Sequence, residues 1–237
     1  MRMTPERTTE IGKIAAKILL DTKSVLFNVE EPFRLTSGRL SPVYIDCRRL
    51  VSFVEERETL SKLAAEILAD GIGMDTIDYI AGGETAGIPY AAFISTEMRK
   101  PMLYIRKKPK GFGRMAQIEG TFDNSPSKKP HVVLVEDLQT DGGSKRVFVN
   151  ALRNAGAVCE HAFVVFHYGI FEQSLKNMAD MGVTLHELTN WWHVLDVARE
   201  QEYFPESTLE SVESFLKAPE IWQEVHSPLA GSSGWVI

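Results

Sequence analysis

The stretch VVLVEDLQTDGGS, residues 132–144, decides the fold that this sequence predicts. Its first four residues are all apolar, which is typical of a central strand in a parallel sheet that is buried on both faces. The apolar run ends in Glu136 and Asp137, and a turn with two glycines then leads into a helical pattern. Because open α/β sheets bind ligands at the carboxyl ends of their strands, we expect a binding site here.

The residue types in this segment favour a ribose phosphate as the ligand. The carboxylates of Glu136 and Asp137 can accept hydrogen bonds from the vicinal hydroxyls of a sugar. Gly142 and Gly143 allow backbone N–H groups to turn toward an anion, and the N-terminus of the following helix adds its dipole. The alternative is an ordinary strand–turn–helix capped by Ser144. The acidic pair together with the glycine pair favours the binding site, and the absence of a Gly-Lys-Ser/Thr sequence excludes a nucleotide P-loop.

Outward from this segment, strands alternate with helices, which predicts an α/β fold with a parallel sheet flanked by helices. We expect helices over 5–21, 54–71, 87–97, 144–155, about 171–180 and about 206–217, and strands within 76–83 and over 102–106, 131–136 and 159–166. Short strands and turns are expected in residues 24–51. The chain is therefore predicted to be one domain, 1–237, with a small N-terminal hood lobe over about 1–50 and a possible C-terminal contribution to it, a core over about 54–180 and a C-terminal extension over about 181–237.

The composition indicates an ordinary globular protein of 237 residues that carries a net charge of −6. This charge argues against a nucleic-acid binder or a membrane-surface protein. No apolar run approaches the roughly 18 residues that a membrane span needs. The two cysteines are too few for a disulfide framework, and the histidines lack the spacing of a zinc site. We therefore predict a cytoplasmic protein with no nucleic-acid or membrane partner.

Three further segments have a composition that suits a phosphorylated ligand. The stretch GGETAGIP, residues 82–89, follows a predicted strand and opens a helix, so its backbone N–H groups could hold a second phosphate. The stretch YIRKKPKGFGRMAQIEG, residues 104–120, carries five cations and three glycines, and it is either a solvated loop or a lid that closes over a pyrophosphate. The stretch FRLTSGRLSPVYID, residues 33–46, is a polar turn between apolar positions, which a structural hairpin would also explain.

These four segments, in this order, resemble those of the orotate phosphoribosyltransferase family, within the type I phosphoribosyltransferase superfamily. The likeness spans about residues 25–166. VVLVEDLQTDGGS is similar to the superfamily's signature for phosphoribosyl diphosphate (PRPP), and the other three are similar to the pyrimidine-side segment, the pyrophosphate-side loop and the mobile catalytic loop. The resemblance implies a transferase of pyrimidine (UMP) biosynthesis, which moves phosphoribosyl from PRPP to N1 of orotate and releases pyrophosphate.

The resemblance also implies roles for individual residues. The residues implied to bind PRPP are Thr85, Ala86, Arg106, Lys107, Lys110, Glu136, Asp137, Leu138, Gln139, Thr140, Asp141, Gly142, Gly143 and Ser144. Those implied to bind orotate are Thr36, Tyr44, Ile45 and Thr140. Lys110 and Asp137 would be catalytic. Mg²⁺ would be held mainly by PRPP and water, with no protein ligand, and a homodimer would form in which loop 107–119 closes over the neighbouring subunit's site.

The chain departs from the family pattern at several positions. Three of them, where the family often has lysine, lysine and histidine respectively, are Thr36, Ala86 and Phe112. An arginine that would hold the orotate carboxylate is expected after the strand at 159–166, but Tyr168 and its neighbours stand there. Arg34 or Arg39 could take its place.

Three other functions fit parts of the same pattern. A phosphoribosyltransferase for another base would share the PRPP signature. A regulatory protein that senses PRPP and binds nucleic acid would share the fold, although the negative charge and the lack of a helix-turn-helix pattern disfavour it. A structural domain that binds a nucleoside phosphate would leave the lysine-rich loop without a purpose.

Overall fold

A computed structural model of the chain describes residues 3–34, 40–110, 117–121 and 129–226. Within these ranges the main feature is a six-stranded sheet in the order β10–β9–β8–β5–β6–β7. Its strands are β5 (Tyr79–Gly83), β6 (Met102–Ile105), β7 (Ile118–Glu119), β8 (His131–Gln139), β9 (Val158–His167) and β10 (Thr184–Asn190). β7 runs antiparallel to β6, and the other neighbours pair in parallel. The predicted α/β fold class is thereby confirmed.

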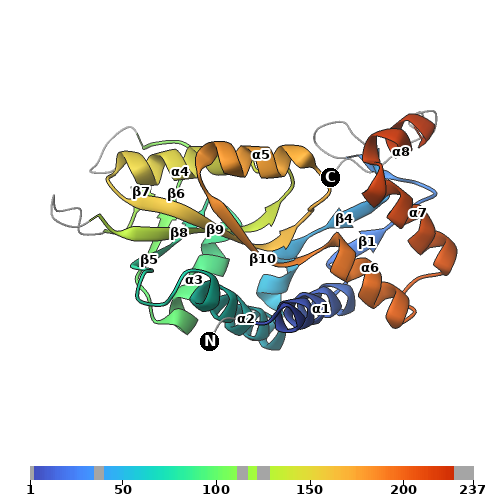
Figure 1. Ribbon diagram of the computed structural model, residues 1–237, viewed down its shortest axis with the longest axis horizontal. Coiled ribbons are helices and arrows are strands. Elements are labelled where there is room, and N and C mark those ends of the chain that lie inside the picture. Colours follow the sequence, from blue (N-terminus) through green and yellow to red (C-terminus); the bar gives the residue numbers. More distant parts are fainter. Residues whose placement is uncertain (1–2, 35–39, 111–116, 122–128, 227–237) are drawn as a thin grey trace.

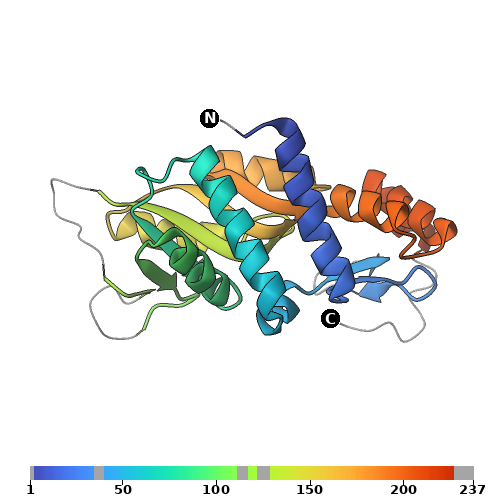
Figure 2. The same cartoon turned by 90° about the horizontal axis from the view of Figure 1, so that it is seen from below.

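Helices cover both faces of this sheet (Figure 1). They are α1 (Pro5–Asp21), α2 (Val54–Gly71) and α3 (Gly87–Met98) on one face, and α4 (Lys145–Asn154) and α5 (Glu172–Met181) on the other. Figure 2 shows α1 and α2 running across the lower face. Because both faces are covered, the inner strands carry continuous apolar runs, as the sequence predicted for residues 132–135. Among the helices within the described ranges, none has both the length and the apolar character that a membrane crossing requires.

The first helix illustrates how local sequence determines an element. The Arg7 backbone N–H donates to Oγ1 of Thr4 at 3.3 Å, and Pro5 occupies the first helical position, where its missing N–H does no harm. Ile11, Ala15 and Leu19 recur every four residues and are fully buried. This single apolar stripe faces the core, so helix 5–21 forms as predicted.

The central strand β8 is longer than the sequence predicted. We expected it to end at residue 136, but Leu138 pairs with Phe166 and Gln139 pairs with His167 on β9. The polar residues that the sequence assigned to a loop therefore belong to the strand itself. The reason is that β9 offers backbone partners along this whole stretch, and strand pairing overrides a local polar composition.

The N-terminal lobe consists of two small antiparallel sheets and one 3₁₀ helix. β1 (Val25–Phe27) pairs with β4 (Val43–Ile45), and β2 (Phe33–Arg34) pairs with β3 (Leu40–Ser41). The 3₁₀ helix (Cys47–Ser52) then leads into α2. We call residues 25–52, within their described part, the hood lobe.

The sheet extends past residue 180, where the sequence placed the end of the core. β10 pairs in parallel with β9 along its whole length and lies at the edge of the sheet. Its sequence, TLHELTN, has few apolar residues, because an edge strand is only partly buried. For that reason the sequence pattern did not predict a strand there.

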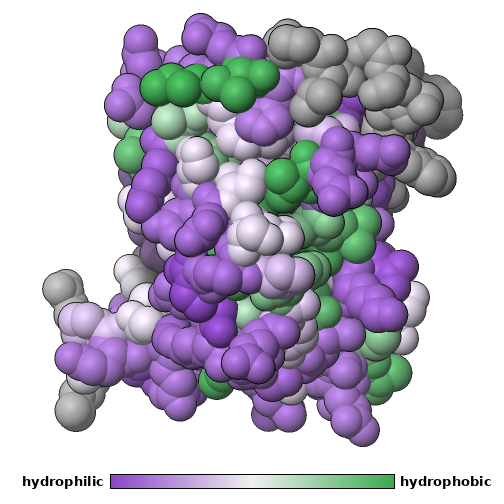
Figure 3. All heavy atoms as spheres, turned by 90° about the vertical axis from the view of Figure 1, so that its right-hand side faces the viewer, coloured by the Kyte–Doolittle hydropathy of each residue, from purple (hydrophilic) through white to green (hydrophobic). Residues whose placement is uncertain are grey.

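The last three helices join the core to the hood lobe. α6 (Trp191–Glu200) packs against α1, and α7 (Glu206–Lys217) and α8 (Pro219–His226) follow it. The Leu40 backbone N–H, in the hood lobe, donates to Oε1 of Gln223 on α8 at 2.7 Å. The outer face of these helices is mostly hydrophilic, and apolar side chains gather near its top, where α8 lies (Figure 3).

Candidate active site

A cavity of about 1500 Å³ opens at the carboxyl edge of the sheet. Its walls come from residues 44–51 of the hood lobe, 83–89, Lys107, 136–145, 168–173 and 217–220. The segments at 83–89, 136–145 and 168–173 lie at or just after the ends of β5, β8 and β9. The cavity therefore lies where open parallel sheets bind their ligands.

Most of the residues that the sequence singled out meet in this cavity. Those on its wall are Tyr44, Ile45, Thr85, Ala86, Lys107, Glu136, Asp137, Leu138, Gln139, Thr140, Asp141, Gly142 and Ser144. They come from four segments that are far apart in the sequence. Thr36 lies outside the described residues, and Gly143 is not on the cavity wall.

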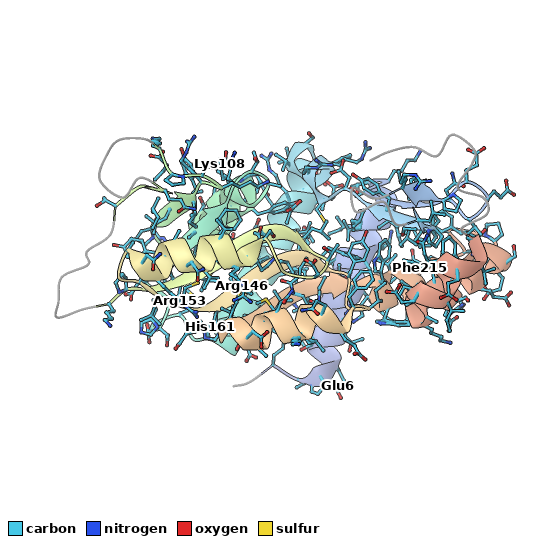
Figure 4. All side chains as sticks on the ribbon, turned by 90° about the horizontal axis from the view of Figure 1, so that it is seen from above. Glu6, Lys108, Arg146, Arg153, His161 and Phe215 are labelled. Atoms are coloured by element: carbon cyan, nitrogen blue, oxygen red, sulfur yellow. The ribbon has the colours of Figure 1, made fainter. Side chains whose placement is uncertain are left out.

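Two of the cations predicted to bind PRPP lie away from this cavity. Lys110 forms an ion pair with Glu119 on β7, and Nη1 of Arg106 lies 3.6 Å from the same carboxylate. Neither side chain is on the cavity wall. Figure 4 shows Lys108, in the same segment, left of centre at the upper edge, and Phe215 on α7 in the right-hand part of the molecule. This placement follows from the pairing of β6 with β7, which carries the start of the loop to the edge of the sheet.

The turn between β8 and α4, residues 140–144, contains the glycine pair for which the sequence predicted an anion site; we call it the phosphate loop after that prediction. Gly142 has a φ of +77°, in the left-handed region that favours glycine. The Gly143 N–H donates to Oδ1 of Asp141 at 2.9 Å. Ser144 occupies the N-cap position, but its side chain makes no capping hydrogen bond. The side chain of Ser144 therefore does not cap α4, as the alternative of an ordinary strand–turn–helix would require.

The adjacent carboxylates of Glu136 and Asp137 have different surroundings. Successive residues of a strand point to opposite faces. Glu136 faces α4, where its Oε2 lies 2.7 Å from Nζ of Lys145, whose side chain is fully buried. Asp137 faces the opposite side of the sheet, where the charges of Lys145 and Arg48 both act on its carboxylate. Asp137 is thus the member of the pair that is left to accept hydrogen bonds from a ligand.

Lys145 is a site residue for which the sequence carried a signal that we did not use. A cation at the first position of a helix opposes the helix dipole. Such a residue needs a nearby carboxylate, and Glu136 is the acidic residue that the preceding strand offers. Both groups are buried, so each charge needs the other: a single charge left in this medium of low polarity would cost folding free energy.

The ionisation of Asp137 is governed mainly by burial. Burial raises the pKa of its carboxyl above the usual range, and the charge of Glu136 raises it further. A backbone hydrogen bond, Lys145 and Arg48 act in the opposite direction. A raised pKa means that the folded protein is stabilised by this group at low pH and loses that contribution as the pH rises through the folded-state pKa. Ionised Asp137 therefore costs folding free energy, as is typical of a functional residue.

On the other side of the cavity, the hood lobe, the segment after β9 and α7 contribute Arg48, Tyr168 and Lys217, to which the sequence assigned no binding role. Nη2 of Arg48 donates to the hydroxyl of Tyr44 at 3.2 Å, and its Nε donates to Asp46 at 2.7 Å. Tyr168 is buried and stacks on Phe171, with ring centroids 6.1 Å apart. Lys217, at the end of α7, also reaches the cavity wall. The hydrogen-bond pattern of Arg48 and the position of α7 depend on folding, so no local pattern indicated them.

The pyrophosphate-side loop, residues 82–89, is held tightly against its neighbours. A Cβ atom added at Gly87 would lie 2.3 Å from the carbonyl oxygen of Val135, so only glycine fits there. The Lys107 backbone N–H donates to Oε2 of Glu84 at 2.6 Å, and the peptide bond between Glu84 and Thr85 is cis. The contact with Glu84 brings the start of the cationic segment to the cavity.

The described residues offer no ready-made metal cage. Within them, no group of three or more His, Cys, Asp or Glu side chains converges on one point. His161 and His186 lie 3.1 Å apart through their ring nitrogens, but burial lowers the pKa of His186 to about 4 and no third ligand accompanies them within the described part of the chain.

Fold and site together define a class of protein. A parallel sheet flanked by helices, a small antiparallel lobe beside its carboxyl edge and a glycine-containing turn after the central strand are the features of a type I phosphoribosyltransferase.

Comparison with known proteins identifies the family. No protein-family model matches the chain. The chain is 49% identical over 217 residues to the orotate phosphoribosyltransferase of Ruegeria sp. (strain TM1040), which covers 92% of this chain and 94% of that one. The crystal structure of orotate phosphoribosyltransferase from Aeropyrum pernix is 30% identical, with a TM-score of 0.65 over 80% of this chain and 99% of that one. The structure of Leishmania donovani UMP synthase matches 86% of this chain and 42% of its own, at 28% identity and a TM-score of 0.72. The chain belongs to the orotate phosphoribosyltransferase family, which confirms the family and the enzyme activity that the sequence predicted.

Proposed function

We propose that the cavity binds PRPP and orotate side by side and transfers the phosphoribosyl group to N1 of orotate, which yields orotidine 5′-monophosphate and pyrophosphate. The observation that carries this proposal is the meeting of three elements on one cavity wall: the phosphate loop, the acidic end of β8 and the pyrophosphate-side loop. In this arrangement the phosphate loop holds the 5-phosphate, and residues 83–89 face the pyrophosphate. Tyr44 and Ile45, on the hood side, face the pyrimidine, with Thr140 close to both substrates.

The chain's own residues act mainly by positioning and by electrostatics. Asp137 accepts a hydrogen bond from a ribose hydroxyl and fixes the sugar relative to the phosphate loop. The anomeric carbon then develops positive charge as pyrophosphate leaves, as in glycoside cleavage. Such a reaction needs aligned reactants, exclusion of water and neutralisation of the leaving group rather than a covalent intermediate.

Mg²⁺ suits this donor set without a dedicated protein cage. It prefers oxygen ligands, keeps several waters, and is commonly bound through one or two carboxylates together with substrate phosphates. Of the two carboxylates at the end of β8, Glu136 is already paired with Lys145, so Asp137 is the protein group best placed to approach an ion carried by PRPP. When bound, the ion supplies positive charge to the pyrophosphate.

We further propose a homodimer in which loop 107–119 closes over the neighbouring subunit's site. Arg106 and Lys110 lie outside the cavity of their own chain, which supports a role at another subunit. Their pairing with Glu119 keeps both cations near the sheet edge until a polyphosphate offers more negative charge than one carboxylate.

The dimer is tested by mixing two defective variants. Asp137→Asn loses a ribose-hydroxyl acceptor, and Lys110→Ala loses the loop cation. If each site uses Asp137 of one subunit and Lys110 of the other, a mixed dimer has one intact site. Co-expression in equal amounts is expected to restore roughly a quarter of wild-type activity, since about half of the dimers are mixed and half of their sites are intact. Activity no higher than the mean of the two separate variants would exclude the shared site.

The identity of the base is tested with a substrate panel. With PRPP and Mg²⁺ present, pyrophosphate release is expected with orotate and not with uracil, adenine or hypoxanthine. The reason is that only orotate among them carries a carboxylate, which Arg48 and Lys217 on the cavity wall are able to attract. Equal release with a second base would favour a phosphoribosyltransferase of different specificity. Salt-dependent binding of DNA or RNA without any turnover would favour a regulatory protein.

We also propose a cytoplasmic location, which the state of the two cysteines supports. Cys47 and Cys159 are both buried and free, which supports a reducing compartment, and we therefore place the enzyme in the cytoplasm.

A further inference from the structure

A chain of hydrogen bonds runs from the edge of the sheet to the base of the phosphate loop. Nδ1 of His167, at the end of β9, lies 2.5 Å from Oε2 of Glu187 on β10. Nε2 of the same ring lies 2.8 Å from Oγ of Ser174 on α5. Nε2 of Gln139, at the end of β8, donates to the same Oγ at 2.8 Å. Ser174, His167 and Gln139 are all buried, with 1%, 6% and 1% of their surfaces exposed.

The direction of two of these contacts follows from chemistry alone. The amide nitrogen of Gln139 is only a donor, so the Ser174 oxygen accepts from it. The Glu187 carboxylate is an acceptor, so Nδ1 of His167 donates to it. The ring of His167 thus links the Ser174 hydroxyl to the Glu187 carboxylate.

This relay is not a hydrolytic centre, although serine, histidine and glutamate follow one another in it. A nucleophile must reach its substrate. Ser174 is almost completely buried, and neither Ser174, His167 nor Glu187 is on the cavity wall. Gln139 is the one member that lines the cavity. The relay therefore acts on the site through Gln139.

Gln139 supports the phosphate loop directly. A Cβ atom built at Gly142 would lie 3.2 Å from Cδ of Gln139, so the amide lies against this residue of the loop. Helix α5, which carries Ser174, makes a second contact with the phosphate loop: Nδ2 of Asn177 donates to the Asp141 carbonyl at 2.8 Å. Ser174 and Asn177 are three residues apart on α5 and hence lie on one face of it. Helix α5 lies beside α4 on the upper face of the sheet (Figures 1 and 4).

The far end of the relay is also anchored. Nδ2 of Asn190 donates to Oε1 of Glu187 at 2.8 Å, and Oδ1 of Asn190 caps α6 by accepting from the backbone N–H groups of Trp192 and His193. The carboxylate that orients His167 is therefore held by the start of a helix. The contacts between Gln139, Ser174, His167 and Glu187 therefore favour one arrangement of these side chains, while Oε1 of Gln139 is buried and has no hydrogen-bond partner within the described residues.

We propose that Glu187, His167 and Ser174 form a buried relay that holds Gln139, and through it the phosphate loop, in the conformation that receives the 5-phosphate of PRPP. In this role Ser174 and His167 are positioning residues for the substrate and do not touch it. The proposal rests on the proposed function of the phosphate loop. The proposal predicts that damage to the relay weakens PRPP binding more than it lowers the turnover rate once both substrates are bound. The reason is that a loop without this support must be ordered at the moment PRPP binds, which costs binding free energy.

The test compares two buried serines on helices. Ser174→Ala is expected to raise the KM for PRPP by about tenfold, the equivalent of about 1.4 kcal/mol, with kcat and the KM for orotate changed by less than about threefold. Ser61→Ala is the control, because Ser61 is also buried but donates to the Arg57 carbonyl of its own helix, at 2.6 Å, and does not line the cavity. It is expected to leave the PRPP KM unchanged. A PRPP KM in Ser174→Ala within twofold of wild type would overturn the proposal.

Two further measurements separate the possible failures. His167→Phe keeps a ring of similar size and removes both nitrogens, and its effect on the PRPP KM should not add to that of Ser174→Ala, since both break the same relay. Fully additive effects would contradict a relay.

PRPP affinity is also measured by calorimetry without orotate. If wild type and Ser61→Ala fail to turn over orotate, the proposed function fails, while the calorimetric comparison still decides whether Ser174 supports the phosphate loop.

Discussion

Replacing Lys110 by alanine is expected to lower turnover by about a hundredfold or more, with the fold intact. The loss follows from removing a positive charge that neutralises pyrophosphate as it leaves. In the structure the Lys110 side chain pairs with Glu119, and both side chains are partly exposed. Such a pair contributes only about 0–1 kcal/mol to stability, so the free energy of unfolding should hardly change. Steady-state kinetics with saturating PRPP and orotate, together with urea unfolding, measure the two effects separately.

The matched control is Lys100→Ala, which removes the same charge from a residue just before β6 and off the cavity wall. It is expected to keep turnover close to that of the wild type. Near-normal turnover of Lys110→Ala would remove this lysine from the mechanism. A loss of turnover accompanied by an equal loss of stability would point instead to a structural role.

Replacing Lys145 by methionine is expected to destabilise the fold by about 3–5 kcal/mol. Methionine is similar in length and suits a helix, so the main change is the loss of the charge beside Glu136. That carboxylate is only 8% exposed, and without its partner it remains as an uncompensated buried charge. Urea unfolding at neutral pH measures the difference in free energy.

The double variant Lys145→Met with Glu136→Gln is the control for this second prediction. It removes both charges, and replacement of a complete buried pair is often nearly neutral for stability. Most of the lost stability is therefore expected to return. A single variant that loses less than about 1 kcal/mol would show that Glu136 finds another way to be neutralised, and the pair would not be the determinant of this part of the fold.

Local patterns were sufficient to predict most of the secondary structure. The helix expected over 54–71 forms as Val54–Gly71, because its apolar residues repeat at helical spacing and acidic residues occupy its first turn. The apolar run at 132–135 forms the centre of the sheet. The sequence did not predict β10, because an edge strand lacks a continuous apolar run. This strand forms by pairing with the backbone of β9. The extra length of β8 has the same cause.

For the site, the sequence predicted which residues of the β8 segment line the cavity better than it predicted which residues from other segments surround them. It identified the residues at the end of β8 and the phosphate loop, because glycines and carboxylates at such a junction are informative on their own. It did not identify Lys145, Arg48 or Lys217, which reach the cavity through folding. It also did not distinguish Arg106 and Lys110 from Lys107, since which cations face the cavity depends on the pairing of β6 with β7.

The stretch VVLVEDLQTDGGS by itself determined the central strand, and it predicted a site for a ribose phosphate at its carboxyl end, because apolar runs, carboxylates and glycines act through local chemistry. Only the tertiary structure decided how the two carboxylates differ. Strand geometry points Glu136 and Asp137 to opposite faces, and α4 supplies Lys145 as the ion-pair partner of Glu136, while burial dominates the surroundings of Asp137. The same holds for Gln139, whose partners on β9, α5 and β10 come together only when distant segments pack, since burial and hydrogen-bond geometry arise between elements and not within them.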